Sequence, residues 1–329
     1  MTKQDVVDLI LQEADSSTSD YASAYAPANI ALCKYWGKRN TELNLPVTSS
    51  LSVSLGEKGT HMALSRAEAD RLILNGEELA PDAPPMRRLT AFLNLFRGSE
   101  TTGFLVESRN TIPTAAGLAS SASAFASLVR ALDGLFGWEL DGRSLSILAR
   151  LGSGSASRSL YDGFVEWHVG AAEDGMDSFA EPLPNDWPEL RLGVVTVSQE
   201  PKPVGSREAM QRTVESCDLY ASWPIKVAND LIQIKEAIRE QDFLRLGEAA
   251  ESNALAMHAT MIATWPPVLY WLPGSVDVMQ RVWALREQGM ALYFTMDAGP
   301  NVKLLFEAKN ELEITRAFPD VECIAPFTR

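Results

Sequence analysis

The chain has 329 residues, of which 46% are hydrophobic and 22% charged, a composition typical of a water-soluble globular protein with a substantial core. Its net charge of -14 argues against general binding to nucleic acid or to a membrane surface, so any anionic substrate requires a local basic pocket. Three widely spaced cysteines and three unclustered histidines argue against a zinc site and favour a reduced, cytoplasmic setting.

The N-terminal segment is acidic and amphipathic with helical period over residues 1–14, which predicts a helix and not a signal peptide. Residues 15–20 are rich in Ser, Thr and Asp and read as a mobile link, so residues 1–20 are expected to form an extension. No apolar run approaches the roughly 20 residues that a membrane span needs.

The first segment with candidate chemistry runs from Ala26 to Lys38. Lys34, Tyr35 and Lys38 interrupt an otherwise apolar context. Because a lysine is seldom fully buried without a partner, Lys34 either meets an anion or extends its amine to solvent. The alternative is a strand end with solvated lysines.

The region between residues 53 and 108 shows short apolar runs separated by turn residues. It predicts strand pieces at 53–55 and 62–64 around a turn at 56–59, and a strand at 71–74 before the tight turn Asn75-Gly76. A proline-rich loop at 80–86, a helix at 86–96 and a strand at 103–108 are expected to follow.

Small residues gather between Pro113 and Ala124, directly before a predicted helix at 124–132. The free N–H groups and partial positive charge of a helix start favour phosphate, and serine hydroxyls add hydrogen bonds or hold a metal. The candidate anion-binding residues are Gly117, Leu118, Ala119, Ser120, Ser121, Ala122 and Ser123. The alternative is an ordinary helix start, because serine is a common N-cap.

A second glycine- and serine-rich segment spans residues 152–161, between a predicted helix at 143–151 and a predicted strand at 164–168. Arg158 offers a planar fork that suits a carboxylate or phosphate. The alternative is a flexible surface loop, which the adjoining apolar residues disfavour.

Three prolines within residues 181–189 mark the best candidate domain boundary. We therefore expect an N-terminal domain at 21–188 and a C-terminal domain at 189–329. The C-terminal part predicts a strand at 192–197, helical patterns near 206–240, 242–260 and 275–288, a strand at 291–295 and a further element at 302–306.

Two C-terminal segments also carry candidate chemistry. Lys202 and Arg207 lie in a Pro- and Gly-containing stretch, for which a solvated basic turn is the default interpretation. Asp297 follows an apolar strand and precedes Gly299-Pro300, where aspartate commonly shapes a turn. By itself each signal is weak.

Together these segments resemble the GHMP kinase superfamily and, within it, the diphosphomevalonate decarboxylase family. The resemblance runs from about Tyr25 to about Leu305. Its carriers are residues 29–38, 45–53, 113–124, 153–161, 163–167, 258–260 and 297–301. Cys33, Ser157 and Asp162 depart from the family pattern without replacing a functional group.

The resemblance implies an α/β fold of two lobes, with an N-terminal lobe like the second domain of ribosomal protein S5 and a ferredoxin-like C-terminal lobe. It implies an active site between them that uses ATP and Mg²⁺ to convert mevalonate 5-diphosphate into isopentenyl diphosphate, ADP, phosphate and CO₂. A cytoplasmic homodimer is the expected state.

The resemblance also assigns roles. Asp297 would accept the proton of the tertiary hydroxyl, Arg158 would hold the substrate carboxylate, and Lys34 would lie near the reacting oxygens. Residues 117–123 would hold ATP, with Ser121 at the metal. The carboxylate would be bordered by Ser153, Gly154 and Ser155, and the 5-diphosphate would be gripped by Tyr35, Lys38, Ser206 and Arg207.

Two other classes of function stay open. One is a relative that acts on mevalonate or its monophosphate, as a 3-kinase or a phosphomevalonate decarboxylase. Such kinase-only relatives are expected to lack the Lys/Asp pair that Lys34 and Asp297 supply here. The other is a non-catalytic ligand-binding homologue.

Overall fold

Two long antiparallel strands, β1 (Tyr21–Cys33) and β4 (Ser50–Ala67), form the centre of a seven-stranded sheet in this computed structural model. The structure describes residues 1–14, 17–98, 102–111 and 120–327. The strand order is β6-β5-β7-β4-β8-β9, with β1 paired to β4 as well. The other strands are β5 (Arg71–Leu74), β6 (Glu77–Glu78), β7 (Gly103–Asn110), β8 (Phe164–Trp167) and β9 (Ala180–Pro182).

The predicted turn at residues 56–59 is wrong, because β4 continues through it as one strand. Gly56 has φ +58°, which bends the strand without reversing it. β1 stays paired on both sides of the bend, with Pro27 opposite Gly59 and Asn29 opposite Ser54. The hairpin at Asn75-Gly76 is confirmed, since Leu74 pairs with Glu77.

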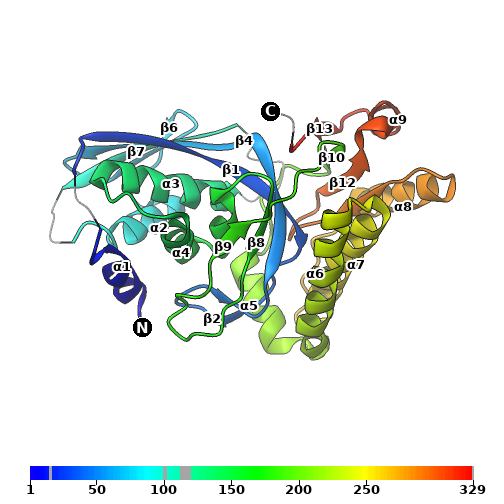
Figure 1. Cartoon of the computed structure of the whole chain (residues 1–329), viewed down its shortest axis with the longest axis horizontal. Helices are drawn as coiled ribbons and strands as arrows, with labels where there is room; N and C mark the ends of the chain where they lie inside the picture. Colours follow the sequence, from blue (N-terminus) through cyan, green and yellow to red (C-terminus); the bar gives the residue numbers. More distant parts are fainter. Residues whose placement is uncertain (15–16, 99–101, 112–119, 328–329) are drawn as a thin grey trace.

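Helices cover one face of this sheet, the lower face in Figure 1. The central one, α3, contacts both β1 and β4. Its apolar residues recur at helical spacing, so one stripe of the helix is buried on the sheet. The elements on this side are α1 (Lys3–Leu11), α2 (Pro84–Leu93), α3 (Ser120–Phe136), α4 (Gly142–Gly152) and the short 3₁₀ helix η1 (Gly154–Leu160).

The C-terminal part is built on a four-stranded antiparallel sheet of order β11-β12-β10-β13. Its strands are β10 (Leu190–Val195), β11 (Tyr293–Thr295), β12 (Val302–Glu307) and β13 (Glu322–Ile324). Its longer helices are α5 (Ser206–Ser216), α6 (Trp223–Glu240), α7 (Phe243–Ile262), α8 (Pro273–Glu287) and α9 (Glu311–Ala317). Short elements complete the fold, namely β2 (Lys38–Asn40), β3 (Leu45–Pro46), η2 (Asp218–Ser222) and η3 (Ala308–Asn310).

The helical pattern expected over residues 206–240 is divided in the structure. Helix α5 ends where Cys217 adopts an extended backbone, and η2 intervenes before α6 begins. Pro224 lies in the first turn of α6, the place in a helix where a missing N–H costs nothing. This break lets α5 run separately from α6.

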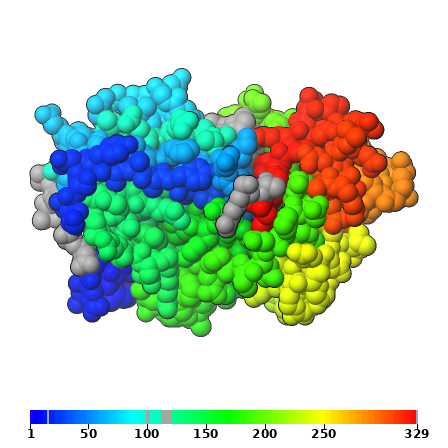
Figure 2. Space-filling view, turned by 45° about the horizontal axis from the view of Figure 1, so that its top comes forward, coloured from blue at the N-terminus to red at the C-terminus, as the bar shows by residue number. Residues whose placement is uncertain are grey.

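The two parts share a hydrophobic core at their seam. Helices α6 and α7 contact β1 of the larger sheet, and α7 also contacts β11 and β12 of the smaller one. Ile30 and Leu32 on β1 belong to the same buried cluster as Val227 on α6. Figure 2 shows the two halves of the sequence side by side in close contact. The mixed α/β fold with two parts is confirmed, and no described helix is long and apolar enough to cross a membrane.

Candidate active site

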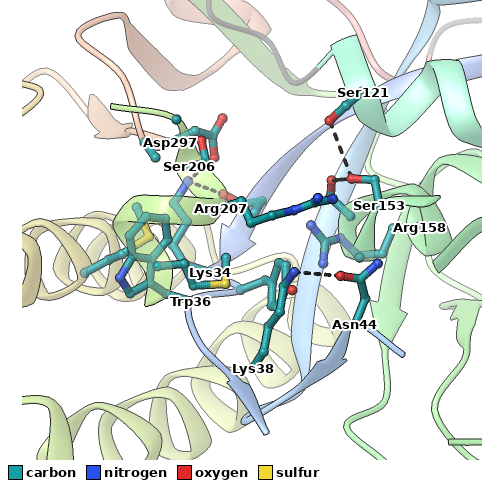
Figure 3. A pocket seen from close by; sticks show the side chains of 18 of the residues that line it. Lys34, Trp36, Lys38, Asn44, Ser121, Ser153, Arg158, Ser206, Arg207 and Asp297 are labelled. Atoms are coloured by element: carbon teal, nitrogen blue, oxygen red, sulfur yellow. Dashed lines mark hydrogen bonds and ion pairs between the residues drawn. The ribbon is translucent and has the colours of Figure 1, made fainter. Parts of the chain in front are cut away.

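A cavity of about 430 Å³ lies at the seam and is lined by residues from both parts of the chain. Figure 3 shows charged and hydroxyl side chains converging on it from opposite sides. Eleven of the residues singled out in the sequence line it, namely Lys34, Tyr35, Lys38, Ser121, Ser153, Gly154, Ser155, Arg158, Ser206, Arg207 and Asp297. The fold therefore gathers segments that are far apart in the sequence around one space.

Lys34 and Asp297 form an ion pair at one end of this cavity. Lys34 directly follows β1 and is 1% exposed, so the solvated alternative is wrong for this lysine. Its Nζ donates to the Ala31 carbonyl at 2.8 Å and to Asp297 Oδ1 at 2.9 Å. Asp297 lies just beyond β11, and 24% of its side chain is exposed toward the cavity. The carboxylate is thus both held and reachable.

A second lysine approaches the other oxygen of this carboxylate. Lys303 on β12 is 1% exposed, and its Nζ lies 3.7 Å from Asp297 Oδ2. Burial alone would raise the pKa of Asp297, but Lys34 and Lys303 outweigh it and hold that pKa well below its ordinary value. Asp297 is therefore ionised at neutral pH. Lys303 was not among the residues singled out in the sequence, although a lysine within the apolar strand Val302–Glu307 was a usable signal.

Arg158 faces the cavity from the buried helix η1, so the alternative of a flexible loop is wrong for this segment. Arg158 is 3% exposed; its Nε donates to Ser52 Oγ at 3.1 Å and its guanidinium also donates to Ser50 Oγ. Burial lowers its pKa to about 10, which leaves it charged at neutral pH. No ion pair joins Arg158 to a carboxylate among the described residues. Its fork is therefore available to an anionic ligand.

Hydroxyl groups line the side of the cavity beside α3. Ser121 Oγ lies 3.5 Å from Ser153 Oγ, which in turn lies 3.4 Å from Ser155 Oγ. Gly154 between them is tightly enclosed, because a Cβ there would come within 2.9 Å of the Tyr35 and Trp167 rings. The chain thus needs glycine where the two serines approach the ligand space.

The predicted nucleotide loop is described only in part. Gly117, Leu118 and Ala119 lie outside the described residues, and α3 begins at Ser120. Ala122 and Ser123 are buried, and Ser123 Oγ is 2.7 Å from Thr60 Oγ1 on the sheet. The hydroxyl of Ser123 is therefore turned away from the cavity, unlike that of Ser121.

Positive charge gathers at the opposite end. Lys38 Nζ donates to Asn44 Oδ1 at 2.6 Å, and burial together with nearby Arg207 lowers the pKa of Lys38 to about 8. Arg207 is exposed at the first turn of α5, beside Ser206. Tyr35 contributes a buried hydroxyl with no hydrogen-bond partner in the described structure. This end is suited to a highly charged anion.

Arg88 is a lining residue that was not singled out in the sequence, and Lys202 and His258 lie near the site without lining the cavity. Arg88 on α2 faces the same cavity, with its guanidinium 5.7 Å from the centre of the Phe125 ring. Lys202, named in the sequence only as part of a turn, donates to Ser206 Oγ at 3.3 Å. His258 on α7 lies 3.1 Å from the Asp297 carbonyl, and burial lowers its pKa to about 3, so it is neutral. Arg88 directly follows Arg87 in α2, and nothing in this helix sequence marks either arginine as part of a site.

Family models match the chain in two segments. Residues 26–180 match the diphosphomevalonate decarboxylase-like N-terminal domain, and residues 193–325 match the mevalonate 5-diphosphate decarboxylase C-terminal domain. Among curated proteins, the diphosphomevalonate decarboxylase of Candida albicans is 38% identical over 309 residues, which are 88% of this chain and 85% of that protein. The enzyme of that name from Bos taurus is 40% identical over 303 residues, 84% of this chain and 74% of its own.

Solved structures give the same picture. Mevalonate diphosphate decarboxylase from Staphylococcus aureus aligns with a TM-score of 0.87 and 38% identity, covering 93% of this chain and 95% of that one. A structure described as MDDEF in complex with MVAPP, AMPPCP and magnesium aligns with a TM-score of 0.86 and 41% identity, over 93% and 97% of the two chains.

Proposed function

The chain belongs to the diphosphomevalonate decarboxylase family, and from that premise we propose how the cavity described above carries out the ATP-dependent decarboxylation of mevalonate 5-diphosphate. The observation that carries the proposal is the Lys34–Asp297 pair, which faces the same cavity as Arg158 and the cationic end. The substrate has a hydroxyl, a carboxylate and a diphosphate. They match a base beside two buried lysines, a guanidinium with no carboxylate partner among the described residues, and a basic patch.

The Asp297 carboxylate accepts a hydrogen bond from the tertiary hydroxyl of the substrate. Because two lysines hold its pKa low, the carboxylate is a weak base. It therefore orients the hydroxyl first, and takes the proton as the new O–P bond forms and that oxygen becomes acidic. Lys34 fixes the carboxylate and lies close to the oxygens that gain charge.

Arg158 holds the C1 carboxylate, with Ser153, Gly154 and Ser155 at its border. When the phosphorylated oxygen leaves C3 with its electron pair, the C1–C2 bonding electrons form the new double bond and CO₂ departs. That step requires the C1–C2 bond to align with the orbital that empties at C3. The two serines on β4 that fix Arg158 make such alignment reproducible.

ATP lies along the start of α3. A smaller cavity of about 250 Å³ shares Ser121 and Arg88 with the main one and is lined largely by apolar residues such as Leu89 and Phe125. That environment suits a flat base, and the shared residues lead its phosphates toward Asp297. Arg88 and Ser121 then lie where the phosphate chain passes.

Mg²⁺ usually keeps several waters and is held by one or two carboxylates together with substrate phosphates. The described residues contain no group of three or more His, Cys, Asp or Glu side chains that could hold a metal. We infer that the phosphates of ATP would carry the ion, and that the Ser121 hydroxyl, which lines the cavity, would be its protein ligand. Bound there, Mg²⁺ supplies neutralisation of phosphate charge.

Tyr35, Lys38, Ser206 and Arg207 hold the 5-diphosphate. We extend the proposal to a ribosomal protein S5-like N-terminal lobe over 21–188 and a ferredoxin-like lobe over 189–329. The antiparallel order β11-β12-β10-β13 supports the latter, since it follows from a β-α-β-β-α-β path. A homodimer and a cytoplasmic location stay predictions.

The decisive experiment measures the release of ADP and of CO₂ in parallel reactions that contain ATP and either mevalonate, its 5-phosphate or its 5-diphosphate. We expect equal amounts of both products with the diphosphate alone. ADP without CO₂ would indicate a 3-kinase, and preferred turnover of the monophosphate would indicate a phosphomevalonate decarboxylase. Nucleotide binding with neither product would indicate a non-catalytic homologue.

A further inference from the structure

The N-terminal helix α1 precedes the matched segment 26–180 but is built firmly into the N-terminal part. Val6 and Val7 are buried in the core that α2, α3 and α4 also form. Gln4 Nε2 donates to the Leu95 carbonyl at 3.0 Å, and Thr2 and Asp5 cap the first turn reciprocally. The first turn of α1, including half-buried Lys3, therefore has a fixed place.

That place borders the cationic end of the active site. A second cavity of about 300 Å³ is lined by Lys3 from α1 and by Lys38 and Arg207. It shares Lys38, Asn44, Arg207 and Met210 with the main cavity, so the two spaces adjoin along these residues. Lys3 thus lies beside the cationic end of the main cavity, to which the 5-diphosphate is assigned.

Four cations from four separate elements meet here without enough acid to balance them. Lys3, Lys38, Arg88 and Arg207 come from α1, β2, α2 and α5. None of the four forms an ion pair within the described part of the chain. The carboxylates in the walls of the second cavity are Glu42 and Glu215. Burial first, and then Arg207 and Arg88, hold the pKa of Lys3 below its ordinary value although Glu42 opposes them.

Clustered cations repel one another in the free protein, and a ligand with several negative charges relieves that repulsion. A diphosphate carries more charge than a monophosphate and extends one phosphate further from the carbon chain. The outermost cation of the cluster therefore gains most from the terminal phosphate. Lys3, on the far side of Lys38 and Arg207 from Asp297, has that position.

We propose that Lys3 is a substrate-binding residue, through which the N-terminal helix completes the site for the terminal phosphate of the 5-diphosphate. This inference rests on the proposed assignment of Lys38 and Arg207 to that diphosphate. It gives α1 a function beyond packing: the extension adds selectivity for the diphosphate over the monophosphate.

The test compares Lys3→Ala and Lys3→Arg with wild type, in protein whose purification tag is at the C-terminus. Lys309→Ala is the matched control, because it removes an exposed lysine far along the chain. We expect Lys3→Ala to raise KM for mevalonate 5-diphosphate roughly three- to tenfold with kcat within about twofold. In Lys3→Ala, we expect the KM for ATP to stay unchanged and the salt dependence of the KM for mevalonate 5-diphosphate to become shallower than in wild type. We expect Lys3→Arg to restore most of the affinity for mevalonate 5-diphosphate.

Arg207→Ala, measured in parallel, separates this inference from the function on which it rests. If Arg207→Ala weakens diphosphate binding and Lys3→Ala does not, the inference is overturned and the site assignment stands. If neither weakens it, the assignment of the diphosphate fails as well. If Lys3→Ala raises the KM for mevalonate 5-diphosphate and the KM for ATP alike and lowers the melting temperature, Lys3 has a structural role and the inference is also overturned.

Discussion

Lys34 Nζ lies 2.9 Å from Asp297 Oδ1, although 263 positions separate the two residues in the chain. One follows the long strand of the N-terminal part, and the other follows a short strand of the C-terminal part. The reacting end of the cavity therefore exists only when the two parts are docked. A buried pair of this kind is costly to break, because the remaining charge loses its partner.

Replacing Asp297 by Asn keeps the shape of the side chain but removes its capacity to accept a proton. We expect kcat to fall roughly 100- to 10,000-fold, the usual contribution of a positioned acid or base. Binding of ATP and substrate, measured by calorimetry, should persist. The exposed change Asp320→Asn serves as control, and a kcat within a few-fold of wild type would remove Asp297 from the role of base.

Changing Lys303 to Met removes one of the two cations beside Asp297 and lets the pKa of that carboxyl rise. A group with a depressed pKa stays ionised until the pH falls below that value, so raising the pKa moves the loss of activity to higher pH. We expect kcat/KM, measured from about pH 5 to pH 9, to begin its fall on the acid side at a higher pH in Lys303→Met than in wild type. The other cations that interact with the Asp297 carboxylate are Lys34, Lys202 and Arg158, and His258, which lies against the Asp297 carbonyl, is neutral.

The control for that profile is Lys309→Met, in which an exposed lysine is lost. It should retain the wild-type pH dependence. An acid limb that stays unchanged in Lys303→Met would mean that Lys303 does not influence the ionisation of Asp297.

Arg158→Lys keeps the charge but loses the planar fork and the bonds to Ser50 and Ser52. We expect turnover to fall roughly 10- to 100-fold, the effect of losing one charge-assisted hydrogen bond. The loss should lie in kcat more than in the KM for ATP. Arg316→Lys on the surface of α9 is the comparison, and an effect confined to ATP affinity would argue against a carboxylate clamp at Arg158.

Ser121 and Ser123 make an internal comparison on one helix. Ser121→Ala should raise the KM for ATP about tenfold, because its hydroxyl faces the cavity. Ser123→Ala should instead lower the melting temperature, since its hydroxyl pairs with Thr60. Equal effects of the two variants on the KM for ATP would show that the hydroxyl of Ser121 does not contact ATP.

Arg207→Ala should weaken the binding of mevalonate 5-diphosphate by about one to two decades. The 5-phosphate should lose much less, so that discrimination between the two ligands shrinks. Arg212→Ala, five residues further along α5 and paired with Glu208, is the matched control. Equal weakening of both ligands would show that Arg207 does not read the terminal phosphate.

Local signals in the sequence identified the segments of the site. Small residues before a helix, a lysine in an apolar run and an aspartate after a strand are each visible within about ten positions. The same signals located most helices and strands, because periodicity is a local property. They were wrong at residues 56–59, where pairing to β1 keeps β4 extended, and incomplete at Cys217, where η2 interrupts the helical pattern.

By itself, then, the sequence determined which kinds of groups the protein could bring to an anionic substrate. Tertiary structure alone decided which of them face it. Ser121 and Ser123 are two positions apart, about 200° around a helix, so docking of α3 on the sheet turns one hydroxyl to the cavity and the other to Thr60. Lys3 and Arg88 carry no local mark, because what distinguishes each of them is a neighbour that only folding brings near. Lys303 is visible in the sequence only as a lysine in an apolar run, and its place beside Asp297 depends on the fold.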